Sequence, residues 1–166
     1  IVYNGVSESE TVSGVTANFF SVNNLDEFAA GDTLTEADVE SSARVVVLGA
    51  SVAEDLFGEA YPVGRSVKIN GVSYGNPDNT AYIPISTAQS RLYPERTRTG
   101  AKAVSAIYAE ATSEELADAA TEQVTEILRE QHRITYAGED DFSIFSQIEL
   151  LSTSVTVTVT LIAFLG

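Results

Sequence analysis

Apolar and polar residues follow one another along this chain in runs whose spacing predicts both strands and helices. Runs of strand length occur at residues 44–48, 81–85, 103–111 and 142–145. Residues 1–30 alternate more weakly, and Val12, Val15 and Phe19–Phe20 predict short strands or a turn of helix before Val22. Strands, hairpins and helices are therefore interspersed, and this order favours an α+β fold over a doubly wound parallel sheet.

The clearest helix is predicted between Ser113 and His132. Apolar residues recur there at the spacing of a single helical face; they are Leu116, Ala120, Val124 and Ile127. A shorter helix is predicted from Ser86, as its N-cap, to about Leu92.

Residues 43–58, ARVVVLGASVAEDLFG, place a glycine turn between a strand and a helix. Ser51 and Glu54 match a capping box, and Gly58 suits the left-handed position that ends a helix. Many phosphate-binding loops begin in the same way. Gly49, however, is not followed by the glycine and lysine of a Walker loop or by the dinucleotide pattern, so we predict a purely structural turn.

Two further segments contain strand signals. Asn70–Gly71 is the dipeptide favoured in two-residue hairpin turns, which predicts a hairpin over residues 66–74. Residues 155–160 alternate valine and threonine, as strands do, but an apolar run follows at 161–165. A bilayer span needs about 20 residues, so the tail is either a strand or the first part of a truncated transmembrane helix.

The charge of the chain argues against some classes of binding partner. The 166 residues hold 24 acidic and nine basic side chains, a formal net charge of −15, and only two lysines, Lys68 and Lys102. Such a chain repels nucleic acid and anionic lipid head groups. Dense carboxylates with scarce lysine indicate adaptation to high salt, as in a halophilic archaeon, although an ordinary acidic domain is the alternative. The absence of methionine predicts a piece of a longer protein.

No residue pattern indicates catalysis, a metal or a cofactor. A hydrolase would have to combine Ser51 or Ser86 with His132, the single histidine, and no nucleophile-elbow motif is present. With one histidine and no cysteine, zinc is unsupported. The carboxylate clusters lack calcium-loop spacing and are read as solvated faces; they are Glu8/Glu10, Glu114–Glu115 and Glu139–Asp141. The phenylalanines are predicted to be core residues; they are Phe19, Phe20, Phe57, Phe142 and Phe145.

Several segments, taken in order, resemble a known family. They are GVTANFF at 14–20, RVVVLGASVAEDLFG at 44–58, PVGRSVKING at 62–71, YIPISTAQ at 82–89, the strand and helix at 103–132, and DFSI at 141–144. Together they are similar to the extracytoplasmic domain of MacB/FtsX-type ABC-transporter permeases. The chain departs from that pattern after Gly71, where a longer strand is shortened, and at Gly31–Asp32, where the family often has Gly-Arg.

The resemblance implies a porter-like α+β part with a smaller inserted subdomain, placed between the first and second transmembrane helices. Residues 1–150 would form the extracytoplasmic core on the outer side of the cell membrane, and residues 151–166 would begin the second span. It also implies a non-enzymatic role in transport or mechanotransmission. The partners would be an ABC-type ATPase subunit, a second permease copy and a membrane-associated accessory protein. A cell-surface binding or regulatory module without transport activity is the alternative.

Overall fold

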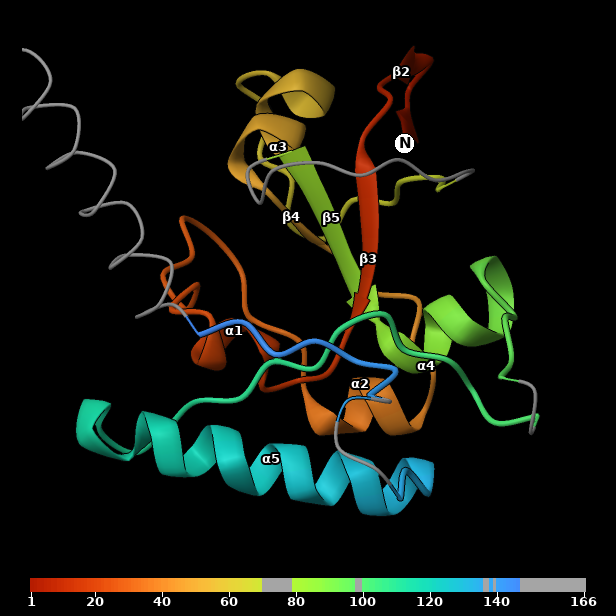
Figure 1. Ribbon diagram of the computed structural model, residues 1–166. Helices are drawn as coiled ribbons and strands as arrows, with labels where there is room; N and C mark the ends of the chain where they lie inside the picture. The colour runs from red at the N-terminus through yellow and green to blue at the C-terminus, as the bar shows by residue number, and fades with distance from the viewer. Residues whose placement is uncertain (70–78, 98–99, 136–137, 139, 147–166) are drawn as a thin grey trace, which may run out of the picture. The chain divides into compact units, whose positions relative to one another are not determined.

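The computed structural model describes residues 1–69, 79–97, 100–135, 138 and 140–146 (Figure 1). The chain divides into two compact units, residues 1–109 and residues 110–166, and each is described separately below. The predicted turn at Asn70–Gly71 and the tail after residue 150 lie outside the described residues.

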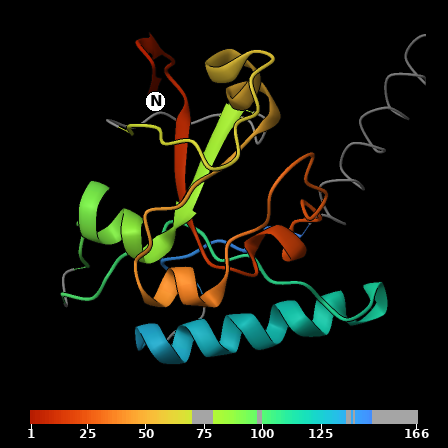
Figure 2. The same cartoon turned by 180° about the vertical axis from the view of Figure 1, so that it is seen from behind.

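A mixed three-stranded sheet forms the centre of the first unit. Strands β3 (Thr11–Val15), β5 (Thr80–Pro84) and β4 (Val47–Leu48) lie in the order β3–β5–β4. β3 runs parallel to β5, with Thr11 opposite Thr80, whereas β4 runs antiparallel to β5. Figures 1 and 2 show β3 and β5 side by side from opposite directions. The strand predicted at residues 81–85 is thus confirmed, one residue earlier.

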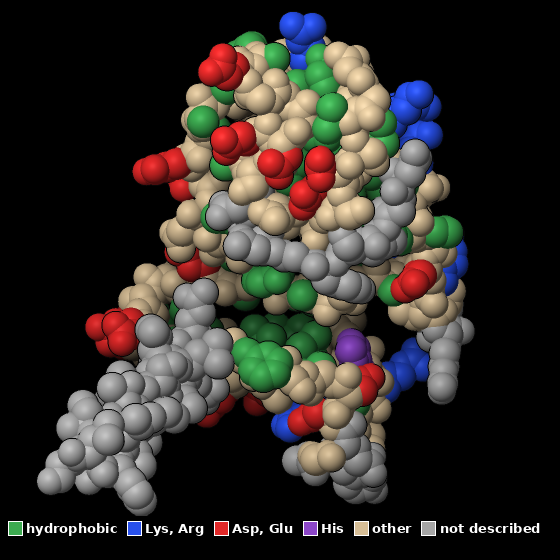
Figure 3. Space-filling model, turned by 90° about the horizontal axis from the view of Figure 1, so that it is seen from above, with side chains coloured by type: hydrophobic (Ala, Val, Ile, Leu, Met, Phe, Trp, Pro, Cys, Tyr) green, Lys and Arg blue, Asp and Glu red, His purple; other side chains and the backbone are tan. Residues whose placement is uncertain are grey.

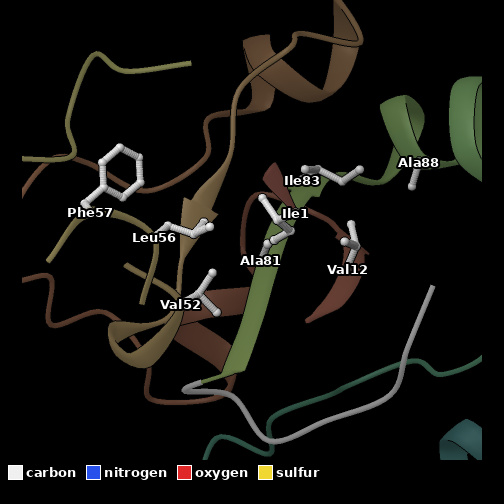
Figure 4. Packing of buried hydrophobic residues seen from close by; sticks show 8 residues of the cluster. All are labelled: Ile1, Val12, Val52, Leu56, Phe57, Ala81, Ile83 and Ala88. Carbon is white, nitrogen blue, oxygen red and sulfur yellow. The ribbon is translucent and has the colours of Figure 1, made fainter. Parts of the chain in front are cut away.

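β5 is the central strand of this sheet, and its side chains pack on both faces. Ala81 and Ile83 point into one apolar cluster, and Tyr82 points into another, as the two-residue period of a strand requires. The first cluster holds Ile1, Val12, Val52, Leu56, Phe57, Ala81, Ile83 and Ala88. Figure 4 shows these side chains around β5, with the α3 residues on one side and Val12 and Ala88 on the other.

A second, two-stranded sheet begins the chain. β1 (Val2–Tyr3) and β2 (Val6–Ser7) pair antiparallel across Asn4–Gly5. Both turn residues have positive φ, 46° at Asn4 and 88° at Gly5, which explains the preference for this dipeptide. The hairpin was missed in the sequence, although its signal is the same as that at Asn70–Gly71. The predicted first arm of that later hairpin makes only an isolated bridge, between Lys68 and Val2.

Short helices connect the strands of the first unit. They are α1 (Phe19–Val22), α2 (Glu36–Glu40), α3 (Ala50–Phe57), α4 (Ile85–Thr87) and the π-helix η2 (Ala88–Leu92). At α2, the Thr35 hydroxyl accepts from the Asp38 amide, and the Asp38 carboxylate accepts from the Thr35 amide. The Thr35 hydroxyl also donates to the Asp38 carboxylate over 2.6 Å, and this hydrogen bond, together with that from the Thr35 amide, lowers the pKa of Asp38. The sequence analysis did not identify this capping box, although its signal is local.

Two predicted helix caps are wrong. α3 begins at Ala50 with Gly49 as its N-cap, and no side chain caps it, so Ser51 already lies inside the first turn. α4 begins at Ile85, directly after β5, so Ser86 is also inside its helix. In both places the backbone turns one or two residues before the first hydroxyl. Gly58 does end α3 at a positive φ of 56°, but its ψ of −125° differs from the left-handed helical conformation that was predicted.

Three predicted strands are shorter than expected or absent. Only Val47–Leu48 of residues 44–48 joins the sheet, and Val45 is exposed. Residues 103–111 and 142–145 lie in the described part of the chain but belong to no strand. A strand requires a hydrogen-bonded neighbour as well as an alternating pattern, and the described residues provide no ladder for either segment.

The second unit contains the long predicted helix. A 3-10 turn, η3 (Glu114–Leu116), leads into α5 (Ala117–His132), which ends with Arg133 in the left-handed conformation. The half-buried residues of α5 are Ala117, Ala120, Thr121, Val124, Thr125, Leu128 and Arg129. Leu116 and Ile127 are exposed, so half of the predicted stripe is wrong. Leu128, four residues after Val124, continues the half-buried face in place of Ile127.

Of the helices in the described part of the chain, none has the length and apolar character that crossing a bilayer requires.

Candidate functional site

A hollow in the first unit lies where β3 and β5 end. It has a volume of about 430 Å³ and is lined by residues 13–16, 18–19, 22, 85 and 104–108. We call it the β3 groove. Crevices at the carboxyl ends of parallel strands are common ligand positions in open sheets, because several chain segments turn away from one another there.

Aromatic rings form one wall of the β3 groove. The Phe19 ring lies 5.4 Å from that of Tyr82 and 5.6 Å from that of Tyr108, the latter edge-on. Phe20 packs against Tyr82 from the cluster beneath, at 5.2 Å. Rings at these spacings have favourable quadrupole contacts. Phe19 thereby packs between the second apolar cluster, which is Val15, Phe20, Leu34 and Tyr82, and the segment at 104–108.

The lining of the β3 groove is uncharged. Its polar groups are the side chains of Ser13, Thr16, Asn18 and Ser105 and the Tyr108 hydroxyl, and no lining residue of the described chain is Asp, Glu, Lys, Arg or His. The Thr16 hydroxyl donates to the Asn18 side-chain oxygen over 2.8 Å. On the face drawn in Figure 3, by contrast, Asp and Glu side chains are spread over several places. The groove therefore differs in charge from the face drawn in Figure 3.

Gly14 allows the first helical turn after β5 to pack closely on β3. A Cβ atom at Gly14 would lie 2.4 Å from the Ala88 Cβ and 3.3 Å from the Ile85 Cα. Real carbon atoms do not approach to the first distance, so a side chain at this position would force the two elements apart. Gly14, the glycine of the GVTANFF segment, thus sets how closely β3 and the helical turn after β5 approach each other beside the groove.

Two hydroxyls after β5 hold the connection between α2 and β4. Ser86 Oγ donates to the Val39 carbonyl, and Thr87 Oγ1 donates to the Ala43 carbonyl over 2.7 Å. Both acceptors belong to residues that end α2 or follow it. The hydrogen bonds therefore connect two distant parts of the sequence and fix the path of the chain into β4.

We expect Thr87→Val to cost about 1–3 kcal/mol of unfolding free energy, because it keeps the side-chain shape but leaves the Ala43 carbonyl without its donor. Chemical denaturation of the 166-residue chain measures the loss. Ser90→Ala, an exposed position on η2, serves as the control and should change stability by less than about 0.5 kcal/mol. Equal effects of the two substitutions would contradict a role for Thr87.

Charged side chains of the second unit meet at the end of α5. Arg129 Nε and one terminal nitrogen each donate to an Asp140 carboxylate oxygen over 2.7 Å. This bidentate contact lowers the pKa of Asp140 and raises the pKa of Arg129. His132 Nδ1 lies 2.7 Å from an Asp141 carboxylate oxygen, and its ring lies edge-on to Phe142. Consecutive aspartates thus attach the following segment to one end of α5.

The Asp140 contact predicts a pH dependence. A carboxyl group whose pKa is lowered on folding stabilises the fold above its unfolded pKa of about 3.9 and loses that contribution as pH falls through the lower folded value. Asp140→Asn should therefore speed amide exchange at residues 140–146 near neutral pH, and the difference from the parent should shrink below about pH 4. Glu122→Gln, at an exposed position in α5, is the control. A difference that persists unchanged in acid would contradict the ion pair.

The residues that were weighed for catalysis or phosphate binding have structural contacts in the fold. The Ser86 hydroxyl donates to a backbone carbonyl, and His132 is partnered by Asp141 at the end of α5. Gly49 is the N-cap of α3 and the start of a structural turn. Among the described residues, no three acidic or histidine side chains are placed to hold a metal ion. That the protein has no catalytic residue remains a prediction.

The aromatic predictions have mixed outcomes. Phe20 and Phe57 are buried, and Phe19 and Phe142 are half-buried, whereas Phe145 is 79% exposed, so its placement in the core was wrong. The β3 groove itself was not predicted. Its walls come from residues 13–22 and 104–108, and no local pattern indicates that these segments meet.

Comparison with known proteins identifies related sequences and one related structure. The family model described as the MacB-like periplasmic core domain matches residues 1–127. The macrolide export ATP-binding/permease protein MacB of Chlorobium phaeobacteroides is 26% identical over 98% of this chain. The pyoverdine export ATP-binding/permease protein PvdT of Pseudomonas aeruginosa is 29% identical over 57% of it.

The solved structure is the crystal structure of the periplasmic region of MacB from Actinobacillus actinomycetemcomitans. It aligns with a TM-score of 0.68 and 25% identity, over 86% of this chain and 64% of that one. The mixed α/β architecture is thus that of a known periplasmic region. The chain spans only about a quarter of the Chlorobium protein, 26% of its length.

Proposed function

Because this chain belongs to the MacB-like periplasmic core domain family, we propose that it is the extracytoplasmic domain of an ABC-transporter permease. In this role it couples ATP hydrolysis to substrate export or mechanotransmission. The observation that carries the proposal is the family match over residues 1–127, to which the similarity with the periplasmic region of MacB adds a shared fold.

ATP would be hydrolysed outside these residues, on a separate ATPase subunit. The relatives that are named ATP-binding/permease proteins suggest a second arrangement, in which the ATP-binding part and the permease belong to one polypeptide. In either arrangement the permease would work as a homodimer, with a membrane-associated accessory protein as a possible third component. The domain itself would transmit force and would catalyse no reaction.

Residues 1–150 would form the core domain, and residues 151–166 would begin the second transmembrane helix. No charged residue follows Glu149, and the last six residues are almost wholly apolar. The domain would accordingly be held on the outer side of the membrane by a helix at each end.

The experiment that tests this placement is surface labelling of the full-length protein in intact cells. The 166 residues contain no cysteine, so a single Tyr61→Cys substitution gives them a unique thiol, and Tyr61 is 64% exposed. A membrane-impermeant maleimide should label this thiol without lysis, whereas the parent protein supplies the background. Labelling that requires lysis would exclude an extracytoplasmic domain.

Adaptation to high salt is part of the same proposal and predicts a rise in stability with NaCl. The Debye length falls from about 10 Å at 0.1 M to about 3 Å at 1 M, which weakens repulsion among the carboxylates. Thermal unfolding of the 166-residue chain between these concentrations measures the effect. A variant with Glu54→Gln, Asp55→Asn and Glu59→Gln should show a flatter salt dependence. Stability that is independent of salt would favour an ordinary acidic domain.

A further inference from the structure

We infer that the β3 groove is a binding site for an uncharged, largely apolar small molecule. This goes beyond the proposed function, because the site lies within residues 1–109 and would bind its ligand whether or not the protein is a transporter. Its volume of about 430 Å³ falls within the usual range of small-molecule pockets, about 300–1,000 Å³.

The charge of the lining selects against ions. In a chain of net charge −15, no described lining residue is acidic or basic. An anion would meet a strongly acidic protein without a cation to pair with it, and a cation would find no carboxylate in the groove. An uncharged molecule needs neither a cation nor a carboxylate as a partner, so both of these penalties are absent.

Apolar side chains of the groove are open to solvent. Val104, Ile107 and Tyr108 are 53%, 73% and 58% exposed, and all three line the groove. A ligand that covers this apolar surface removes it from water, which favours binding. The Phe19 and Tyr108 rings, 5.6 Å apart, offer an aromatic surface for a ring or a branched hydrocarbon. The hydrogen-bonding groups that would orient it come from Ser13, Thr16, Asn18, Ser105 and the Tyr108 hydroxyl.

The dimensions favour a small molecule over a protein partner. Stable protein interfaces bury about 800 Å² on each side and use about 20–30 residues of each partner. The β3 groove is bounded by 13 residues, of which five come from the one segment 104–108. A molecule with a few rings would fill it, whereas a folded partner would need contacts well beyond it.

The test is a fluorescence titration of the 166-residue chain with N-phenyl-1-naphthylamine, an uncharged apolar probe. We expect saturable binding at a single site, and amide shifts in NMR spectra at residues 13–16 and 104–108. Ala106→Phe places a ring in the groove wall at an exposed position and should weaken binding at least about tenfold. Ala109→Phe, just beyond the lining on the same segment, is the matched control and should bind as the parent does.

Four results would overturn the inference. They are non-saturable binding, equal affinities of the two phenylalanine variants, shifts confined to residues outside the groove, and equally tight binding of the anionic probe 1-anilinonaphthalene-8-sulfonate. Circular dichroism shows whether each variant is folded. If Ala106→Phe does not fold, the NMR shifts of the parent protein still test the inference. A negative binding result would not contradict the proposed membrane placement, because surface labelling in cells tests that placement separately.

Discussion

Gly14→Ala is expected to destabilise the chain by about 1–3 kcal/mol, the usual cost of forcing extra volume into a packed core. The new methyl carbon would lie 2.4 Å from the Ala88 Cβ. Strand propensity alone predicts the opposite sign, because alanine is favoured over glycine in a strand by about 0.5–1 kcal/mol. Chemical denaturation of the 166-residue chain therefore distinguishes the close contact from propensity by the direction of the change.

The control for this prediction is a double-mutant cycle with Ala88→Gly, which removes the atom that the new methyl group would strike. Alone, Ala88→Gly should cost about 1 kcal/mol as a glycine inside a helix. Combined with Gly14→Ala it should restore part of the lost stability, so the two changes should be coupled by more than about 0.5 kcal/mol. Additive effects would show that β3 and η2 can move apart at little cost.

Leu56→Ala is expected to have the largest effect of any single substitution considered, a loss of about 2–5 kcal/mol. Leu56 is 4% exposed and packs in the first apolar cluster with Val52 and Ile83. Its truncation would remove apolar contacts and leave a cavity beneath β5. Urea unfolding followed by circular dichroism measures the change in midpoint at constant slope.

Tyr61→Ala is the matched control for Leu56→Ala, because the same unit carries this side chain at 64% exposure. Its effect should stay within about 0.5 kcal/mol. If both substitutions cost the same, the cluster around β5 would not be the core of the first unit.

The sequence was most informative where one segment determines its own structure. Residues 80–84 form a short apolar run that is buried on both faces, and the helix over 113–132 has a clear period, so both were predicted. The Asn4–Gly5 hairpin and the Thr35–Asp38 capping box have equally local signals, and both could have been found.

Features that depend on tertiary partners could not be predicted in this way. Residues 103–111 alternate as a strand does, but the described structure gives them no ladder. The importance of Gly14 becomes visible only when Ala88 is placed against it. The β3 groove joins residues near the start of the chain to residues 104–108, so its lining follows from the fold and from no motif.

The measurement that tests the transporter assignment most directly is affinity purification of the full-length protein from native membranes in detergent and high salt, followed by mass spectrometry. The assignment predicts a membrane protein recovered with a stoichiometric ABC-type ATPase, either as a separate subunit or as part of the same polypeptide. Recovery from the soluble fraction, or from membranes without any ATPase, would contradict it and would favour a cell-surface binding module instead.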